Sequence, residues 1–340
     1  MTKFLNVPTI VGHTDFIDVS KKTENLYRGC HLMGRYLAQR LVYGVLTFLL
    51  IASFTFFLMD LLPGSPFQNQ EKLSPEQLNI LRDKYNLNDP LPQRYAAYMV
   101  NLFQGDLGIS FKYDSRPVTD LISERIGPSA QLGIQALVLG VLLGLVLGVI
   151  AALRHNTVVD YGAMFVSVIG ISVPSFVFAS LLQYYVGVKW GVLPVAFWES
   201  PAHTILPTIS LSLGVTASIA RFVRTEMLEV TNQDYVTLAK AKGLDGQSIT
   251  WKHMVRNALI PAITILGPMT AALITGTLVI ERIFSVPGLG ELFVSSITQN
   301  DYTVIMGTTL FFSAVFILMI LIVDLLYGVV DPRIRLGGNK

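Results

Sequence analysis

Long stretches without a charged side chain constrain this sequence more than any other feature. Six of them cover residues 41–59, 126–153, 161–188, 204–220, 257–280 and 302–323. A helix that crosses a bilayer needs roughly 20 mainly apolar residues, because hydrocarbon offers no hydrogen bonds to an exposed backbone. Only 14% of the residues are charged, against about 25% in soluble domains. The sequence therefore predicts an all-α polytopic membrane protein with six transmembrane helices, the fourth being the shortest.

The distribution of Lys and Arg predicts how these helices are oriented. Most of the 25 basic residues fall in segments that share one side of the membrane with the N-terminus, and the basic side is the cytoplasmic one. We therefore expect a multi-pass protein of the cell (inner) membrane with both termini in the cytoplasm. The expected parts are a cytoplasmic tail (1–36), a first transmembrane helix (37–62), an extracytoplasmic insertion (63–125), and a core with five more transmembrane helices (126–340).

The insertion after the first helix is expected to be helical. Ser74-Pro75-Glu76-Gln77 has the pattern of a capping box with proline at the first helical position. Apolar residues at helical spacing follow, and they give each short helix one apolar face. Such a face can pack within the protein or can dock a partner, and the spacing by itself favours packing.

A second polar stretch, residues 231–257, is expected on the cytoplasmic side. Asn232 or Asp234 can cap a helix start, and Gly243 can adopt the left-handed conformation that ends a helix. Tyr235 and Ala239 share a helix face, and the small Ala239 would let another surface approach closely. The segment is either a rigid peg for a groove on another protein or an ordinary solvated loop helix.

Motifs for nucleotide binding and for catalysis are missing from the sequence. It contains no G-x-x-x-x-G-K-[ST] loop, no H-E-x-x-H and no G-x-S-x-G. The single cysteine, Cys30, excludes an internal disulfide, and the five histidines lack ligand spacing. A net charge of +2 does not suggest a nucleic-acid partner. No carboxylate is expected near the middle of a transmembrane helix, which argues against a proton- or sodium-coupled carrier.

The predicted transmembrane helices do contain mildly polar residues and helix breakers. Pro174 removes a backbone hydrogen bond and should bend the third helix. Gly140, Gly144 and Gly148 repeat every four residues, which favours close contact with another helix. Polar residues of this kind can line a pore or can hydrogen-bond between helices. The candidates for a pore or gate are Gln131, Ser172, Pro174 and Thr275.

Several short motifs are weak alone but specific in their order and spacing. They are Leu62-Pro-Gly-Ser-Pro66, Gly105-Asp-Leu-Gly-Ile-Ser110, Ser172-Val-Pro-Ser-Phe176, Tyr235-Val-Thr-Leu-Ala239-Lys-Ala-Lys-Gly243-Leu, His253-Met-Val-Arg-Asn257-Ala-Leu-Ile-Pro261, Glu281-Arg-Ile-Phe-Ser-Val-Pro-Gly-Leu-Gly290 and Asp331-Pro-Arg333. From about residue 35 onward the chain resembles ABC-importer permeases, and more narrowly the B-type subunit of oligopeptide and dipeptide permeases. The stretch from Tyr235 resembles the "EAA" coupling segment of those proteins.

The resemblance implies a type I ABC-importer permease fold and a set of partners. These are a second homologous permease, two ATPase subunits, an extracytoplasmic peptide-binding protein and the surrounding lipid. ATP and Mg²⁺ would be bound by the ATPase subunits, so no cofactor and no enzymatic activity are expected in this chain. The residues that match the ATPase-coupling motif are Tyr235, Ala239, Lys240, Gly243 and Leu244.

One departure from the general motif concerns Thr237, which stands where other permeases have Glu. A carboxylate contact with the ATPase is therefore not expected at that position. The resemblance also leaves the cargo open, since related permeases carry peptides, glutathione or nickel complexes. A self-contained secondary transporter and a membrane-embedded enzyme are the alternatives from other classes.

Overall fold

The computed structural model describes residues 19–61, 74–84, 87–259, 261–274 and 278–330. Within these ranges every regular element is a helix, apart from one isolated β-bridge between Ile109 and Pro117. Five helices are long and apolar enough to cross a membrane, and a bent pair supplies a sixth crossing if it counts as one. The prediction of an all-α polytopic membrane protein with six transmembrane helices is confirmed on that count.

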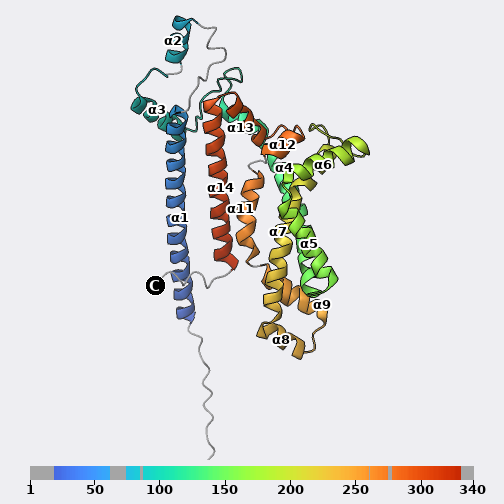
Figure 1. Ribbon diagram of the computed structural model, residues 1–340. Coiled ribbons are helices and arrows are strands. Elements are labelled where there is room, and N and C mark those ends of the chain that lie inside the picture. Colours follow the sequence, from blue (N-terminus) through green and yellow to red (C-terminus); the bar gives the residue numbers. More distant parts are fainter. Residues whose placement is uncertain (1–18, 62–73, 85–86, 260, 275–277, 331–340) are drawn as a thin grey trace, which may run out of the picture.

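Four long helices form the body of the molecule (Figure 1): α1 (Val19–Leu61), α4 (Val118–Leu153), α7 (Ile205–Thr231) and α14 (Tyr302–Val330). All four extend beyond the charge-free runs, and α14 does so at its end, past Asp324. Helix α1 starts within the stretch 1–36, α4 starts within the stretch 63–125, and α7 continues past the charged residues that bound the run 204–220. A charged residue ends an apolar run but does not by itself end a helix, because Lys, Arg and Glu are good helix formers.

Helices α4 and α7 pack closely because three glycines of α4 lie at their contact. A β-carbon added at Gly144 would lie 2.7 Å from the Cβ of Ile219, and one at Gly148 would lie 2.8 Å from the Cβ of Val223. Gly140 meets Val215 in the same way. The four-residue glycine repeat therefore acts as predicted, by letting the backbones of two membrane helices approach each other.

The third transmembrane segment is broken rather than bent. Helix α5 (Val158–Ser172) and helix α6 (Ser175–Leu182), which continues as a π-helix over Gln183–Lys189, meet at an angle of 99°. Pro174 lies between them with φ −56° and ψ 134°, an extended conformation that starts α6. The sequence predicted a bend at Pro174, and the structure shows that the helix ends there and a new one begins.

Three shorter helices lead directly into α14, namely α11 (Ala262–Ile274), α12 (Leu278–Ile283) and α13 (Leu289–Thr298). Glu281 in α12 is completely buried, and its carboxylate lies at the start of α13. It accepts hydrogen bonds from the backbone N–H of Gly290 (2.8 Å) and Glu291 (3.1 Å) and from the hydroxyl of Ser129 (2.8 Å). An anionic side chain is well placed there because helix N-termini carry unpaired N–H groups and partial positive charge.

The insertion between α1 and α4 contains two helices, α2 (Pro75–Lys84) and α3 (Leu91–Phe103). The predicted capping box is present, since the Ser74 N–H donates to the Gln77 side chain and the Gln77 N–H donates to the Ser74 hydroxyl. Helix α3 packs on the end of α1, where Tyr95 stacks on Phe57 with ring centroids 5.2 Å apart. The described apolar face of α3 therefore serves packing, which is the interpretation that the spacing favoured.

A buried carboxylate also fixes the loop that leads from α3 into α4. Asp301, just before α14, accepts hydrogen bonds from the Ser110 hydroxyl and from the backbone N–H groups of Phe111 and Lys112, both at 3.3 Å. The N–H of Val304 also points to Asp301, at 3.4 Å. The Gly105–Ser110 motif is thus held against the first turn of α14, so the insertion and the last transmembrane helix form one unit.

Candidate functional site

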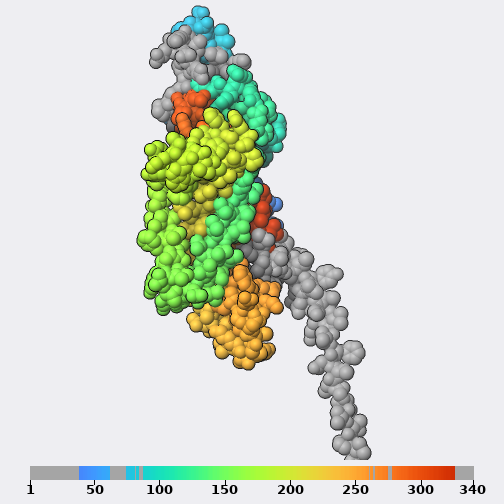
Figure 2. Space-filling view, turned by 90° about the vertical axis from the view of Figure 1, so that its right-hand side faces the viewer, coloured from blue at the N-terminus to red at the C-terminus, as the bar shows by residue number. Residues whose placement is uncertain are grey.

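The segment 231–257 lies at one end of the helical body, and α2 and α3 lie at the other (Figure 1). We call these the α8 end and the α3 end. The segment contains α8 (Asp234–Ala241), the short α9 (Gly246–Ser248), a π-helix (Ile249–Val255) and α10 (Arg256–Ala258). Figure 2 shows it protruding beyond the long helices as a distinct knob.

Helix α8 ends as the sequence predicted. Gly243 has φ +76°, its N–H donates to the carbonyl of Lys240 (3.0 Å), and the N–H of Leu244 donates to the carbonyl of Ala239 (3.3 Å). This pair of bonds is a Schellman motif, which satisfies the last carbonyls of a helix. The start differs from the prediction, because the N-cap residue is Gln233 and neither Asn232 nor Asp234 caps it. Asp234 instead lies in the first turn, where its charge suits the helix end.

One face of α8 is buried within this chain. Val236 is fully buried and Ala239 is 4% exposed, and both belong to a hydrophobic cluster with residues of α4, α7 and the π-helix. Ala239 was expected to let another surface approach closely, and its place in the ATPase contact stays a prediction. The surface that approaches Ala239 is the chain's own, and its small size lets α8 lie close to the body.

Beside the buried face, the segment exposes large apolar side chains. We call them the α8 apolar surface: Tyr235 (40% exposed), Leu238 (55%), Leu244 (43%) and Trp251 (57%). Tyr235 and Leu238 are three residues apart on α8, and α8 packs against the π-helix that carries Trp251. Lys240 and Lys242 are exposed beside them. Large exposed apolar groups that gather on a protruding knob are typical of a protein–protein contact.

The remainder of the segment is a rigid connection between this surface and the long helices. Ile249, Met254, Val255 and Ala258 are buried in the same hydrophobic cluster as Val223 and Met227 of α7. The Asp245 carboxylate caps α9 by accepting from the N–H of Ser248 at 3.0 Å. Hydrogen bonding with Ser248 lowers the pKa of Asp245 below its ordinary value. A force on the α8 apolar surface would therefore reach α7 and α4 through packed side chains.

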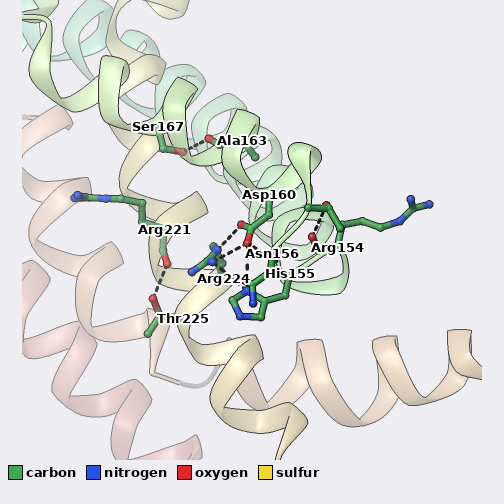
Figure 3. A network of polar contacts seen from close by, with 10 residues as sticks. Arg154, His155, Asn156, Asp160, Ala163, Ser167, Arg221, Arg224 and Thr225 are labelled. Atoms are coloured by element: carbon green, nitrogen blue, oxygen red, sulfur yellow. Dashed lines mark hydrogen bonds and ion pairs between the residues drawn. The ribbon is translucent and has the colours of Figure 1, made fainter.

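A buried ion pair lies where α5 begins, at the same end (Figure 3). Asp160 of α5 is fully buried, and Arg224 of α7 binds it with two hydrogen bonds, from Nε to Oδ1 (2.6 Å) and from an Nη to Oδ2 (2.7 Å). His155 Nδ1 lies 3.2 Å from Oδ2, and the backbone N–H of Asn156 donates to the same oxygen at 3.0 Å. This bidentate pair fixes the start of α5 to α7.

The pore and gate candidates from the sequence do not gather at one place. Ser172 and Pro174 lie at the break between α5 and α6, and Gln131 is exposed on α4. Thr275 lies outside the described residues. Gln183 was not among the candidates, but it has a clearer role. It donates to the carbonyls of Val195 (2.7 Å) and Ile283 (2.9 Å), which anchors the end of α6.

Known proteins with similar sequences define the class of this chain. Residues 144–336 match the family described as binding-protein-dependent transport system inner membrane component, and residues 33–130 match the N-terminal region of such membrane components. The chain belongs to this family of ABC-transporter permeases.

Individual relatives cover nearly the whole chain. It is 46% identical over 304 residues to the dipeptide transport system permease protein DppB of Lactococcus lactis subsp. cremoris, covering 89% of this chain and 100% of the relative. It is 40% identical over 305 residues to the oligopeptide transport system permease protein OppB of Escherichia coli K12, with the same coverage of both chains. The resemblance noted from the motifs is thereby confirmed.

A solved structure supports the fold. The chain is similar to an inward-facing form of the MetNI methionine ABC transporter, with a TM-score of 0.50, 18% sequence identity, and coverage of 66% of this chain and 100% of that chain. The type I ABC-importer permease fold expected from the sequence is confirmed. The region around α8 is thus part of a transport subunit.

The sequence did not reveal every member of the α8 apolar surface. Leu238 and Trp251 are its most exposed residues, and neither was among the candidates. Leu238 stands three residues after Tyr235, so helical spacing could have placed it on the same face. The spacing could not have placed Trp251 on this surface, because the π-helix around it shifts the register of side chains.

Proposed function

We propose that this chain is one of two homologous pore-forming subunits of an ATP-driven importer whose cargo is short peptides. The names of the relatives support the cargo, since both the 46% and the 40% identical proteins are peptide permeases. Lacking a P-loop in its sequence, the chain would depend on partner ATPase subunits for hydrolysis.

The observation that carries the proposal is the pairing of an exposed and a buried face on α8. Tyr235 and Leu238 are open to a partner while Val236 and Ala239 are packed against the body. An ATPase subunit would grip the α8 apolar surface, and its movement on binding and hydrolysing ATP would displace α7 and α4 as one packed unit. Coupling of this kind needs a rigid element with two global positions. We therefore place the α8 end in the cytoplasm.

The α3 end would then face outward, toward an extracytoplasmic binding protein that delivers the peptide. Helix α3 is fixed to α1 by the ion pair between Arg94 and Asp60 (2.6 Å). The loop that follows α3 is fixed to the start of α14 by the hydrogen bond from Ser110 to Asp301. A docked binding protein would therefore act on the transmembrane helices directly. Both termini would be cytoplasmic, in agreement with the distribution of basic residues.

Co-purification with the ATPase subunits tests this proposal. Leu238→Asp and Trp251→Asp place a charge on the α8 apolar surface, and each should abolish association with the ATPase subunits and stop peptide uptake. Ile80→Asp is the matched control, because Ile80 is 67% exposed on α2 at the α3 end. It should leave association unchanged. Normal ATPase association by both surface variants would refute the assigned contact.

A further inference from the structure

Helix α7 is enclosed to an unusual degree for a transmembrane helix of this protein. Its most apolar stretch is 61% buried, against 17% for α1, 33% for α4 and 22% for α14. Hydroxyl groups in the first two turns of α7 serve packing, since Thr208 donates to Gln135 and Ser210 donates to the carbonyl of Leu206. Toward the α8 end, one face of α7 is polar and left open. We call it the open strip: Arg221 and Thr225 are exposed, and Gly214 and Ser218 are half-buried.

The strip is a genuine face of the helix. At 100° per residue its four positions lie within about 60° of one another, and Glu229 continues it by a further turn. Figure 3 shows that Arg221 points away from Asp160, whereas Arg224 forms the ion pair with Asp160. Arg221 lies ten residues before the end of α7 at Thr231, which is about 15 Å of helix.

The open faces of neighbouring helices are very different. On α5 they carry Phe165, Val166, Val168 and Ile169, each at least 42% exposed. On α4 they carry Val138, Leu142 and Val146. Such faces suit lipid tails or an apolar partner. A strip with a guanidinium, two hydroxyls and a glycine does not suit hydrocarbon, where ionisable groups turn to the bundle interior or to water.

We infer that the open strip of α7 lines the water-filled translocation path, and that Arg221 is the cation which a passing substrate's carboxylate meets. The inference rests on the proposed function for the cargo, because a peptide with a free C-terminus carries a carboxylate. Among the described residues no carboxylate lies within ion-pair distance of Arg221. Its planar guanidinium can bind a carboxylate with two parallel hydrogen bonds.

Lipid or the second permease could also lie against the strip, but each explains its composition less well than a water-filled path. Arginine near a helix end can extend its head toward the lipid headgroups, but Ser218 and Gly214 lie deeper in the membrane on the same strip and gain nothing from that arrangement. A dry contact with the second permease would need a carboxylate on that partner to compensate Arg221, since a buried unpaired charge is costly. Both explanations make the strip inaccessible to water. A measurement of water accessibility therefore separates them from the water-filled path.

Cysteine labelling measures that accessibility without any need for transport. Cys30 is the only cysteine, so a Cys30→Ser background is free of thiols. In the assembled transporter a charged methanethiosulfonate reagent should modify Ser218→Cys and Thr225→Cys. It should not modify the controls Val166→Cys, on the apolar face of α5, or Ser210→Cys, which is fully buried in α7. If the strip variants are as unreactive as Val166→Cys, the strip is not in the path.

Peptide chemistry tests the role of Arg221 separately. Arg221→Gln should raise the apparent KM for a peptide with a free C-terminal carboxylate by about tenfold, the effect of losing one hydrogen bond to a charged group. Uptake of the same peptide as its C-terminal amide should not change, and Arg221→Lys should retain part of the preference. Equal losses for the acid and the amide would overturn the role of Arg221.

The two experiments separate failure of this inference from failure of the proposed function. A chain that carries no peptide would show no uptake of either peptide form even as wild type, while the labelling pattern would still report whether the strip is wet. The thermal stability of Arg221→Gln should match that of the wild type, because the described structure gives the Arg221 side chain no ion pair or hydrogen bond. A fall in stability would mean that Arg221 stabilises the fold, which would contradict its exposure to the path.

Discussion

The two ends of this permease bury carboxylates in different ways. At the α8 end, Asp160 is held chiefly by the side chain of Arg224, 64 residues away on α7. At the α3 end, Glu281 and Asp301 are held by backbone N–H groups at the starts of α13 and α14, with the hydroxyls of Ser129 and Ser110 beside them. One end thus uses a charge pair between side chains, and the other uses helix N-termini.

This difference bears on what holds each end in place. The ion pair between Asp160 and Arg224 joins α5 to α7, and the backbone N–H of Asn156 also donates to Asp160, so the start of α5 is held against α7. A carboxylate that accepts from backbone N–H groups fixes the loop itself, because the loop must keep its shape for the bonds to form. The α3 end therefore depends on the shape of its loops, and the α8 end depends on a pair of buried opposite charges.

The largest expected effect comes from leaving the Asp160 charge without its partner. Arg224→Met should destabilise the protein by about 3 kcal/mol, because a buried carboxylate loses its bidentate guanidinium. The measurement is denaturant unfolding in detergent micelles. Asp160→Asn combined with Arg224→Met should recover much of the loss, since no charge then stays buried. A loss below about 1 kcal/mol for Arg224→Met alone would contradict the assignment of Asp160 as buried and ion-paired.

Removing the charge at the α3 end should cost less. Glu281→Gln keeps one acceptor oxygen but turns an NH₂ group toward donors, which should cost about 2 kcal/mol. The same unfolding assay measures it. Glu124→Gln is the control, since Glu124 pairs with Arg116 at an exposed position and surface pairs contribute about 0.5 kcal/mol or less. Equal effects of the two substitutions would show that Glu281 does not cap α13.

The sequence predicted the features that neighbouring residues form and missed the contacts between residues that are far apart in the chain. The capping box at Ser74, the helix end at Gly243 and the glycine repeat facing α7 are written in neighbouring residues, so each could be predicted. The partners of Asp160 and Glu281 could not, because Arg224 and Ser129 lie 64 and 152 residues away. For Ala239 the helix was predicted but its buried face was not, because a helix face is decided by what packs on it.

A smaller effect is expected at Gly243, and it should stay local. Gly243→Ala forces a residue with a β-carbon to keep φ +76°, which costs about 1 kcal/mol. Steric clash does not contribute to this cost, because a β-carbon at Gly243 would meet nothing within 4 Å. Hydrogen exchange of the α8 amides should become faster. Gly246→Ala, equally open but without a positive φ, is the matched control, and similar exchange in the two variants would contradict the strain argument.

The smallest effect on stability should come from the α8 apolar surface, and it separates the two faces of one helix. Leu238→Ser removes a side chain that is 55% exposed, so the unfolding free energy should change by less than about 0.5 kcal/mol. Val236→Ser, two residues earlier and fully buried, should cost about 2 kcal/mol or more, because it leaves a cavity and buries a hydroxyl. If Leu238→Ser nevertheless lowers ATPase-driven uptake while the protein remains as stable as the wild type, the function of Leu238 lies in a contact outside this chain. If it unfolds the protein as Val236→Ser does, Leu238 belongs to the core and the exposed face of α8 has been misassigned.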